Sequence, residues 1–238
     1  MGSKRFPNKI LKKIDHRSVL KYLLDELLKN FKKEEIIVAT TKIKKDDKIC
    51  KFLMKSNFNF FRGSENNLLN RYLECAKKYR VSNIIRITSD CPLVDSRIIN
   101  RMYKIFSKSN IEYYSNTCPP KMSTFPDGSD IEIFSFKSLK KLNKITKSKK
   151  DKEHLYGFWK YKKKFKIKTF KRKKDISMFK YSLDYASDLL LLRNIVKKLK
   201  EKNYTHSPNN IVRIIKNDKK LLRISKLNHL AYLKNKNY

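Results

Sequence analysis

The sequence predicts an α/β protein with a mostly parallel sheet and helices on both of its faces. Short runs rich in β-branched and aromatic residues alternate with amphipathic segments of about 12–15 residues, as in layered α/β folds. The chain of 238 residues contains no internal repeat and no Pro/Gly-rich linker. We therefore expect a single domain over residues 1–238, with a helical, basic C-terminal extension from about residue 189.

The first helix is expected over 18–31, where leucines recur at helical spacing and Ser18 is a candidate N-cap. The last is expected over 207–238, with Ser207 as N-cap and Pro208 in the first turn. Helices between them are expected over 66–80 and 96–110. A further helix is expected at the end of residues 181–200, which are predicted to form a strand, a turn and a helix.

The strands are expected between these helices. Buried strands of a parallel sheet are expected over 34–41, 57–64, 83–90 and 111–117. Polar and apolar residues alternate more strictly over 130–136 and 165–170, which predicts positions near a sheet edge or in an inserted flap.

The charge balance is strongly basic: 59 Lys and Arg against 22 Asp and Glu give a formal net charge of +37. A polyanion partner would explain this charge, but lysines are scattered over nearly every segment. Lys, Asn, Ile, Phe and Tyr are abundant and Gly is rare, as A/T-rich codon usage produces. No RRM, KH, zinc-finger or helix-turn-helix signature occurs, so nucleic acid is the less favoured partner.

The location is expected to be cytoplasmic. Cys50, Cys75, Cys91 and Cys118 are far apart and form no CxxC pair, so we expect free thiols in a reducing compartment. No apolar run is long enough for a membrane span, and no signal peptide is recognised.

Two aspartates end predicted strands. Asp90 closes the run at 83–90 and Asp184 ends another, and a carboxylate there needs a partner or a cation. Ligands of such sheets bind at the carboxyl ends of strands, so the two could share one Mg²⁺. Asp188, at a helix start, also suits the helix dipole.

Other polar groups follow strands or turns. Gly2, Ser3, Arg5 and Lys9 form a loop suited to phosphate. Asp130 and Glu132 alternate onto one face and suit a polyhydroxylated substrate. The remaining candidates are Arg62, Gly63 and Ser64 after one strand, and Glu153 and His154 in "KEHLY".

Eight motifs in order resemble one family: "MGSKRFPNKIL", "EEIIVATT", "FRGSENNLLNRY", "IIRITSDCPLVD", "EYYSNT", "TFPDGSDIEIFSF", "KEHLYGF" and "YSLDYASDL". They resemble the cytidylyltransferases of the spore-coat polysaccharide type, which are related to the acylneuraminate and 3-deoxy-octulosonate cytidylyltransferases. The likeness extends from residue 1 to about residue 225. It implies a Rossmann-like nucleotidyltransferase fold. It also implies transfer of CMP from CTP to an acidic or unusual sugar, with release of pyrophosphate, in polysaccharide or glycan biosynthesis.

The resemblance assigns a role to each matching residue. Arg5 and Lys9 would be catalytic, and with Gly2, Ser3, Arg62, Gly63 and Ser64 they would bind the nucleotide. Asp90, Asp184 and Asp188 would hold Mg²⁺. Asp130, Glu132, Glu153 and His154 would line the sugar side. A homodimer is compatible with the family. The family also has a central strand before the opening loop, so we expect this first strand, about eight residues, to be missing from the sequence.

Two other functions stay open. A non-catalytic RNA- or polyanion-binding protein could use the same fold, although a pure anion binder gains nothing from Asp90 and Asp184 in a basic cleft. A sugar nucleotidyltransferase using UTP or GTP would differ mainly in contacts to the base, which the sequence separates weakly. The acceptor sugar cannot be read from the sequence.

Overall fold

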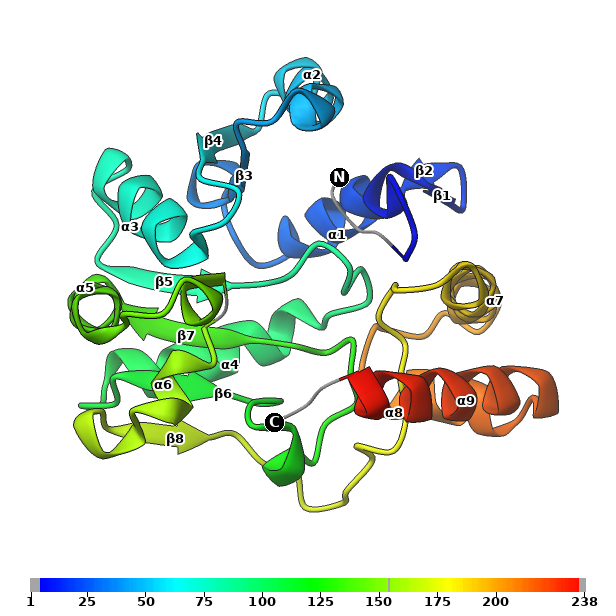
Figure 1. Cartoon of the computed structure of the whole chain (residues 1–238). Coiled ribbons are helices and arrows are strands. Elements are labelled where there is room, and N and C mark those ends of the chain that lie inside the picture. Colours follow the sequence, from blue (N-terminus) through cyan, green and yellow to red (C-terminus); the bar gives the residue numbers. More distant parts are fainter. Residues whose placement is uncertain (1–4, 154, 236–238) are drawn as a thin grey trace.

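The computed structural model describes residues 5–153 and 155–235 as alternating helices and strands (Figure 1). Its α-helices are α1 (Val19–Leu27), α2 (Asp47–Lys55), α3 (Leu68–Lys78), α4 (Ser96–Ser107), α5 (Phe136–Ile145), α6 (Gly157–Lys160), α7 (Ala186–Glu201), α8 (Pro208–Lys216) and α9 (Lys219–Asn235). Its strands are β1 (Lys13–Ile14), β2 (Arg17–Ser18), β3 (Ile37–Thr41), β4 (Asn59–Gly63), β5 (Asn83–Arg86), β6 (Tyr113–Ser115), β7 (Glu132–Ser135) and β8 (Ile167–Thr169). The short 3-10 turns that the site uses are η1 (Lys9–Leu11) and η5 (Lys150–Glu153).

Within the described residues these strands form three sheets. β1 and β2 form an antiparallel pair, β3 and β4 form a parallel pair, and the largest sheet has the order β5-β7-β6-β8. In that sheet β6 and β8 are parallel, whereas β7 is antiparallel to both β5 and β6. The α/β class is confirmed, but the sheet is mixed rather than mostly parallel.

Helices cover both faces of the four-stranded sheet, as predicted. Successive strand residues point to opposite faces, and the neighbours Tyr113 and Tyr114 of β6 accordingly enter different cores. Tyr113 packs with Phe134 and with α5 and α6 through Leu142 and Phe158. Tyr114 packs with α4 in a separate cluster. Each face therefore has its own hydrophobic core.

β7 occupies the interior of the sheet, so the edge position expected for 130–136 is wrong. The polar residue in its alternating pattern, Glu132, is buried and forms an ion pair with Arg86. A polar residue therefore does not mark a solvent-facing side in this strand. The other alternating segment forms β8, which lies at the edge as predicted.

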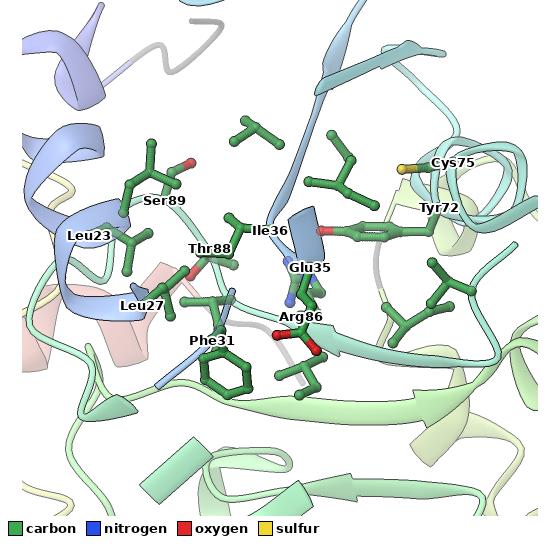
Figure 2. Close-up of a pocket in the computed structure, with 18 of the residues that line it drawn as sticks. Leu23, Leu27, Phe31, Glu35, Ile36, Tyr72, Cys75, Arg86, Thr88 and Ser89 are labelled. Atoms are coloured by element: carbon green, nitrogen blue, oxygen red, sulfur yellow. The ribbon is translucent and has the colours of Figure 1, made fainter. Parts of the chain in front are cut away.

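A cavity of about 590 Å³ lies between β3 and β5 (Figure 2). β3 is hydrogen-bonded to β4 and β5 to β7, and within the described residues no strand joins β3 to β5. The sheet is thus divided at this point, between α1 and α3.

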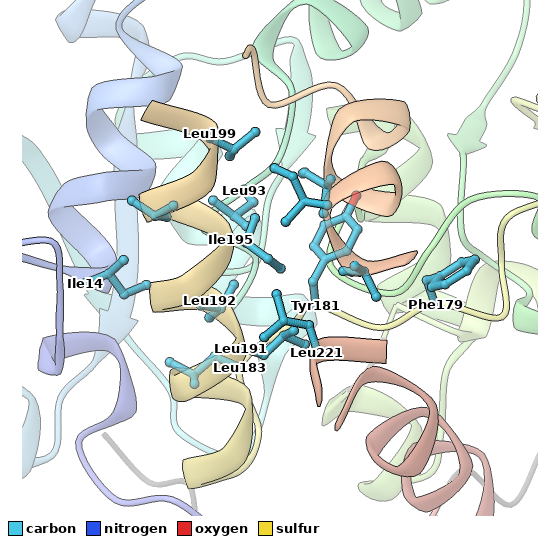
Figure 3. Close-up of a cluster of buried hydrophobic side chains, with 14 of the residues drawn as sticks. Ile14, Leu93, Phe179, Tyr181, Leu183, Leu191, Leu192, Ile195, Leu199 and Leu221 are labelled. Carbon is cyan, nitrogen blue, oxygen red and sulfur yellow. The ribbon is translucent and has the colours of Figure 1, made fainter. Parts of the chain in front are cut away.

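The C-terminal helices pack around α7 (Figure 3). Leu191, Leu192 and Ile195 of α7 are buried against residues of α8 and α9 and against Leu93. The predicted cap at Ser207 is confirmed, because its side chain accepts the Asn210 N–H at 3.2 Å, but the helical segment expected over 207–238 forms two helices, α8 and α9, within the described residues.

The strand expected near 181–184 does not form. Next to this segment the structure shows an isolated β-bridge between Asp127 and Lys180. Tyr181 and Leu183 are instead buried in the cluster around α7. The apolar residues were correctly predicted to be buried, but helices cover them rather than neighbouring strands.

None of the described helices is long and apolar enough to span a bilayer.

Candidate active site

A cavity of about 540 Å³ opens where β5 and β6 end and β7 begins. Because β7 is antiparallel to both neighbours, its first residue, Glu132, pairs with Arg86 at the end of β5 and Ser115 at the end of β6. Loops from distant parts of the chain converge at this edge. The charged side chains that line the cavity are Arg5, Arg86, Asp90, Asp127, Asp130, Glu132, Lys150 and Asp184.

Lys9 brings the two predicted strand-end aspartates together. Its Nζ lies 2.7 Å from Asp90 Oδ2 and 3.2 Å from Asp184 Oδ1, and it donates to the Leu183 carbonyl at 2.6 Å. The Lys9 side chain is only 14% exposed. It reaches this position from the turn η1, which follows Asn8 in a left-handed conformation with φ 57°.

The contact between Lys9 and Asp90 keeps these two groups charged at neutral pH. Burial by itself lowers the pKa of Lys9, but the charges of Asp90 and Asp184 outweigh burial and raise it above its usual value. Burial by itself raises the pKa of Asp90, but the Lys9 ammonium outweighs burial and lowers it. Lys9 and Asp90 therefore form a true ion pair beside the cavity.

Arg5 adds a second cation at the same point. Its guanidinium lies 3.0 Å from Asp184 Oδ1 and 5.4 Å from the centroid of the Tyr185 ring. The Arg5 side chain is 46% exposed, so it is open to an anionic ligand. Gly2 and Ser3, the other predicted loop residues, lie outside the described residues.

Lys180 lies behind Asp184 and was not identified from the sequence. Its side chain is 0% exposed, and its Nζ is 3.1 Å from Asp188, 3.5 Å from Asp184 and 3.9 Å from Asp127. Burial lowers its pKa, but the three carboxylates outweigh burial and raise it. The sequence does contain a signal for a buried lysine, because Lys180 lies within the apolar run "MFKYSL". The many lysines elsewhere in the chain obscured it.

Asp188 turns towards the backbone, not into the cavity. Its Oδ2 accepts the N–H groups of Asp184 and Tyr185, each at 2.8 Å, and its Oδ1 accepts Asn228 Nδ2 at 2.7 Å. It is fully buried and caps the first turn of α7. These contacts favour the helix-start role over that of a metal ligand. They also hold the backbone that carries Asp184.

Asp130 is held in the cavity by its neighbours. Its carboxylate accepts the Thr117 hydroxyl and the Gly128 N–H, each at 2.8 Å. Gly128 has a φ of 110°, and an added Cβ would lie 2.6 Å from Ser182 N. The turn therefore requires glycine where it aims its N–H at Asp130.

Glu132 lines the same cavity but is committed to protein partners. It is paired with Arg86 and accepts the Tyr113 hydroxyl. Glu153 ends η5, the turn whose first residue, Lys150, lines the cavity. His154 lies outside the described residues.

A sequence model of the family described as cytidylyltransferase matches residues 1–236. The chain belongs to the cytidylyltransferase family. The solved structure of a cytidylyltransferase from Leptospira borgpetersenii serovar Hardjo-bovis (strain JB197) is similar, with a TM-score of 0.84 and 31% identity. That similarity covers 95% of this chain and 93% of the other, so the nucleotidyltransferase fold extends over nearly the whole chain.

Two other relatives match part of this cytidylyltransferase. An uncharacterized protein of Methanocaldococcus jannaschii is 37% identical over 154 residues, which are 65% of this chain and 61% of that protein. The spore coat polysaccharide biosynthesis protein SpsF of Bacillus subtilis is 28% identical over 117 residues, which are 48% of this chain and 49% of SpsF. The chain therefore matches about half to three fifths of the length of these relatives, and the resemblance to the spore-coat type is confirmed.

The second predicted nucleotide-binding segment of this cytidylyltransferase, residues 62–64, lies at the end of β4. The Arg62 guanidinium donates to the carbonyls of Thr41 and Ile43, each at 3.0 Å, and pairs with Asp47 at 2.8 Å. The contacts described for Arg62, Gly63 and Ser64 are with the β3–α2 connection and α3, not with Asp90 or Asp184. The structure does not bring this segment together with the aspartate pair.

Proposed function

We propose that this cytidylyltransferase transfers CMP from CTP to a hydroxyl of an acidic or otherwise unusual sugar. The products are a CMP-sugar and pyrophosphate, and the pathway is biosynthesis of a surface polysaccharide or another glycan. Family membership supports the choice of CTP, and the similarity to SpsF supports a polysaccharide role. The cytoplasmic location and the homodimer stay predictions from the sequence.

One observation carries the proposal: Lys9 and Arg5 meet Asp90 and Asp184 at one end of the cavity. Two cations suit a triphosphate, since charge-assisted hydrogen bonds to phosphate oxygens are strong. Two carboxylates beside them would repel that triphosphate unless a metal cation lay between. The combination therefore favours a nucleotide bound together with a metal over an anion bound alone.

The donor set fits Mg²⁺. Oxygens of Asp90 and Asp184 already converge on one cation, the Lys9 ammonium. No group of three or more His, Cys, Asp and Glu able to hold a metal occurs among the residues described. Two carboxylates suffice for Mg²⁺, which usually completes its octahedron with substrate phosphates and water. Bound there, Mg²⁺ would supply positive charge to the phosphate oxygens.

The chain's own residues would contribute by positioning. Arg5 and Lys9 bind the triphosphate and stabilise the charge that develops on the departing pyrophosphate. The sugar oxygen forms a bond to the α-phosphorus as the bond from that phosphorus to the bridging oxygen breaks. The electron pair leaves with pyrophosphate, and the hydroxyl proton passes to water or a cavity carboxylate.

Asp130 would bind the sugar in this arrangement. Its carboxylate lines the cavity and is oriented by Thr117 and Gly128, so it can accept a sugar hydroxyl without first losing freedom. Glu132 would act through Arg86, which it holds at the cavity wall.

The test is pyrophosphate release with Mg²⁺, CTP and a panel of sugar acids and neutral sugars. Lys9→Met, Asp90→Asn and Asp184→Asn should each lower kcat/KM by at least about 100-fold, the order expected when a group that stabilises developing charge is lost. The matched controls are Lys13→Met and Asp175→Asn, both at exposed positions away from the cavity. They should leave kcat/KM unchanged.

Ligand-induced stabilisation separates the alternatives. CTP with Mg²⁺ at about ten times its Kd should add roughly 1.4 kcal/mol of stability, and chelation of the metal should abolish the effect. Stabilisation by UTP or GTP but not CTP would contradict the choice of nucleotide. Stabilisation by a short RNA alone, with no turnover, would favour the polyanion-binding protein.

A further inference from the structure

The outward face of α9 carries a row of exposed leucines. Leu227, Leu230 and Leu233 are 54%, 56% and 47% exposed. Residues three positions apart are neighbours on the surface of a helix, so these side chains form one continuous leucine row. Single exposed leucines are common on protein surfaces, but an apolar patch of contiguous side chains is typical of a surface that binds a partner.

The inward face of the same helix is committed to contacts within the protein. α9 lies beside α7 and α8 (Figure 1). The Ser225 hydroxyl donates to the Lys180 carbonyl at 2.9 Å, and Asn228 Nδ2 donates to Asp188 Oδ1 at 2.7 Å. Tyr232 lines the candidate active site cavity. These contacts fix the rotation of α9 about its own axis, so the leucine row stays on the outside.

The charges of α9 are all of one sign. No Asp or Glu occurs in the segment, whose cations are Lys219, Lys220, Arg223, Lys226 and Lys234. Arg223, Lys226 and Lys234 are exposed, and each lies four residues from Leu227 or Leu230, about one helical turn away. The outward face of α9 therefore combines the leucine row with these three flanking cations.

An anionic bilayer surface complements this face better than the other candidate partners do. It offers hydrocarbon to the leucines and phosphate groups to the cations, as for helices that lie in a membrane interface. Two copies of the chain joined through α9 would bring like charges together, on a protein with a net charge of +37. A nucleic acid would provide phosphates for the cations but would leave the leucine row in water.

We propose that α9 is a membrane-surface helix, which binds reversibly to a bilayer that contains anionic phospholipids. The leucine row enters the boundary between headgroups and acyl chains, and the flanking cations contact lipid phosphates. Because Tyr232 of the same helix lines the candidate active site, docking holds that cavity close to the membrane surface. This role goes beyond the proposed transferase activity and does not depend on it.

Co-sedimentation of the full chain with vesicles tests the proposal. One set of vesicles contains phosphatidylcholine and phosphatidylglycerol, and the other contains phosphatidylcholine alone. The chain should bind the mixed vesicles at least about tenfold more tightly than the neutral ones, and added salt should weaken this binding. Equal binding to both sets of vesicles, or binding to neither, would overturn the proposal.

The leucine row is tested by the double variant Leu227→Ser and Leu230→Ser. Its partition coefficient on mixed vesicles should fall by at least about tenfold, because two half-exposed leucines no longer enter the lipid. The matched control, Leu28→Ser with Met54→Ser, removes two exposed apolar side chains far from α9 in the sequence and should bind as the natural sequence does.

Both double variants change exposed side chains, and circular dichroism checks that they remain folded. Their turnover of CTP without vesicles should equal that of the natural sequence. A failure of vesicle binding is therefore distinguishable from a failure of the proposed transferase activity.

The flanking cations are tested by the triple variant Arg223→Gln, Lys226→Gln and Lys234→Gln. Binding to mixed vesicles should weaken by roughly 100-fold, since each cation near an anionic surface strengthens binding about fivefold.

The matched control for charge is the triple variant Lys48→Gln, Lys51→Gln and Lys55→Gln, which changes exposed residues of α2 and lowers the net charge equally. It should weaken binding by less than about threefold, because charges beyond a Debye length from the lipid are screened. Equal losses in the two triple variants would mean that the basic chain is attracted as a whole, and would contradict the role of α9.

Two further outcomes would assign this face to another partner. If the leucine double variant turned a dimer into a monomer in analytical ultracentrifugation and neither form bound vesicles, the face would be an interface between copies. If a short RNA bound through the flanking cations while vesicles did not bind, the partner would be a nucleic acid. Either result would overturn the proposal.

Discussion

At the scale of single residues, Lys180 balances the acidic side of the site from behind. Its ammonium also donates to the Ser182 carbonyl at 2.8 Å, so it joins the loop of Asp184 to the start of α7. Removing one member of a buried ion cluster leaves the others as uncompensated charges in a medium of low dielectric constant. Removing one charge from the cluster therefore lowers the free energy of unfolding by more than the intact cluster contributes to it.

Lys180→Met is therefore expected to lower the free energy of unfolding by about 3 kcal/mol, measured by urea denaturation. Lys168→Met, at an exposed position of β8, is the matched control and should change it by less than about 0.5 kcal/mol.

A double-mutant cycle of Lys180→Met and Asp188→Asn measures the interaction between these two charges directly. Asp188→Asn removes the fully buried carboxylate that Lys180→Met leaves without its cation. The double variant should be less destabilised than the sum of the two single variants by at least about 1 kcal/mol. Additive losses would mean that the two charges do not interact as their distance indicates.

At the scale of elements, α1 begins at a cap that the sequence predicted correctly. The Ser18 hydroxyl accepts the Lys21 N–H at 3.1 Å. From this start the helix buries Leu20 and Leu24 against β3 and α2, and Leu23 against α4. The cap therefore sets the register of the helix that walls the cavity between β3 and β5.

Ser18→Ala should lower the thermodynamic stability by about 1 kcal/mol, because a helix N–H loses its acceptor. Ser18→Asp supplies another acceptor and should restore most of it, as thermal or urea unfolding can show. Ser107, at the exposed end of α4, provides the comparison, and its change to alanine should be close to neutral. An equal loss at both positions would contradict the capping role.

At the scale of the whole molecule, Glu26 ties the N-terminal helix to two distant parts of the chain. It accepts the N–H and hydroxyl of Ser96, at the start of α4, and it pairs with His206, before α8, at 3.0 Å. Burial raises the pKa of Glu26, but His206, Lys29 and Ser96 outweigh burial and lower it from 4.5 to about 2. The folded state thus favours the ionised carboxylate.

Because the pKa of Glu26 is lowered in the folded state, its contribution to the free energy of unfolding depends on pH. It is fully present above the ordinary pKa of 4.5 and is lost as the pH falls towards about 2. The free energy of unfolding of the natural sequence should therefore fall, relative to Glu26→Gln, by on the order of 3 kcal/mol between pH 5 and pH 2. Urea unfolding at a series of pH values measures the difference.

Glu201→Gln, at the exposed end of α7, is the control and should fall in parallel with the natural sequence. If Glu26→Gln also fell in parallel, the pairing with His206 and Ser96 would not contribute to acid stability.

Local signals in the sequence correctly predicted much of the fold. Ser18 and Ser207 cap their helices, and β3, β4 and β5 form within the expected ranges. Caps and strand ends depend on hydrogen bonds between residues a few positions apart, so a short stretch of sequence contains all the information they need.

The predictions that failed depend on partners far away in the sequence. The alternation in β7 indicated an edge because Glu132 is polar, and its pairing with Arg86 and the hydrogen bond from the Tyr113 hydroxyl allow it to lie inside the sheet. Tyr181 and Leu183 were expected in a strand, and the helices α7 and α8 cover them instead.

By itself, the sequence determined the α/β class and the family, and it singled out Asp90 and Asp184 as candidate site residues. The tertiary structure decided which charges meet. It turned Asp184 towards Lys9 and Asp188 towards the α7 backbone, placed Lys180 beneath both, and left the edges of β3 and β5 facing one cavity. The physical reason is range: propensity and capping act over one helical turn, whereas ion pairing and strand pairing depend on which distant segments the hydrophobic cores bring together.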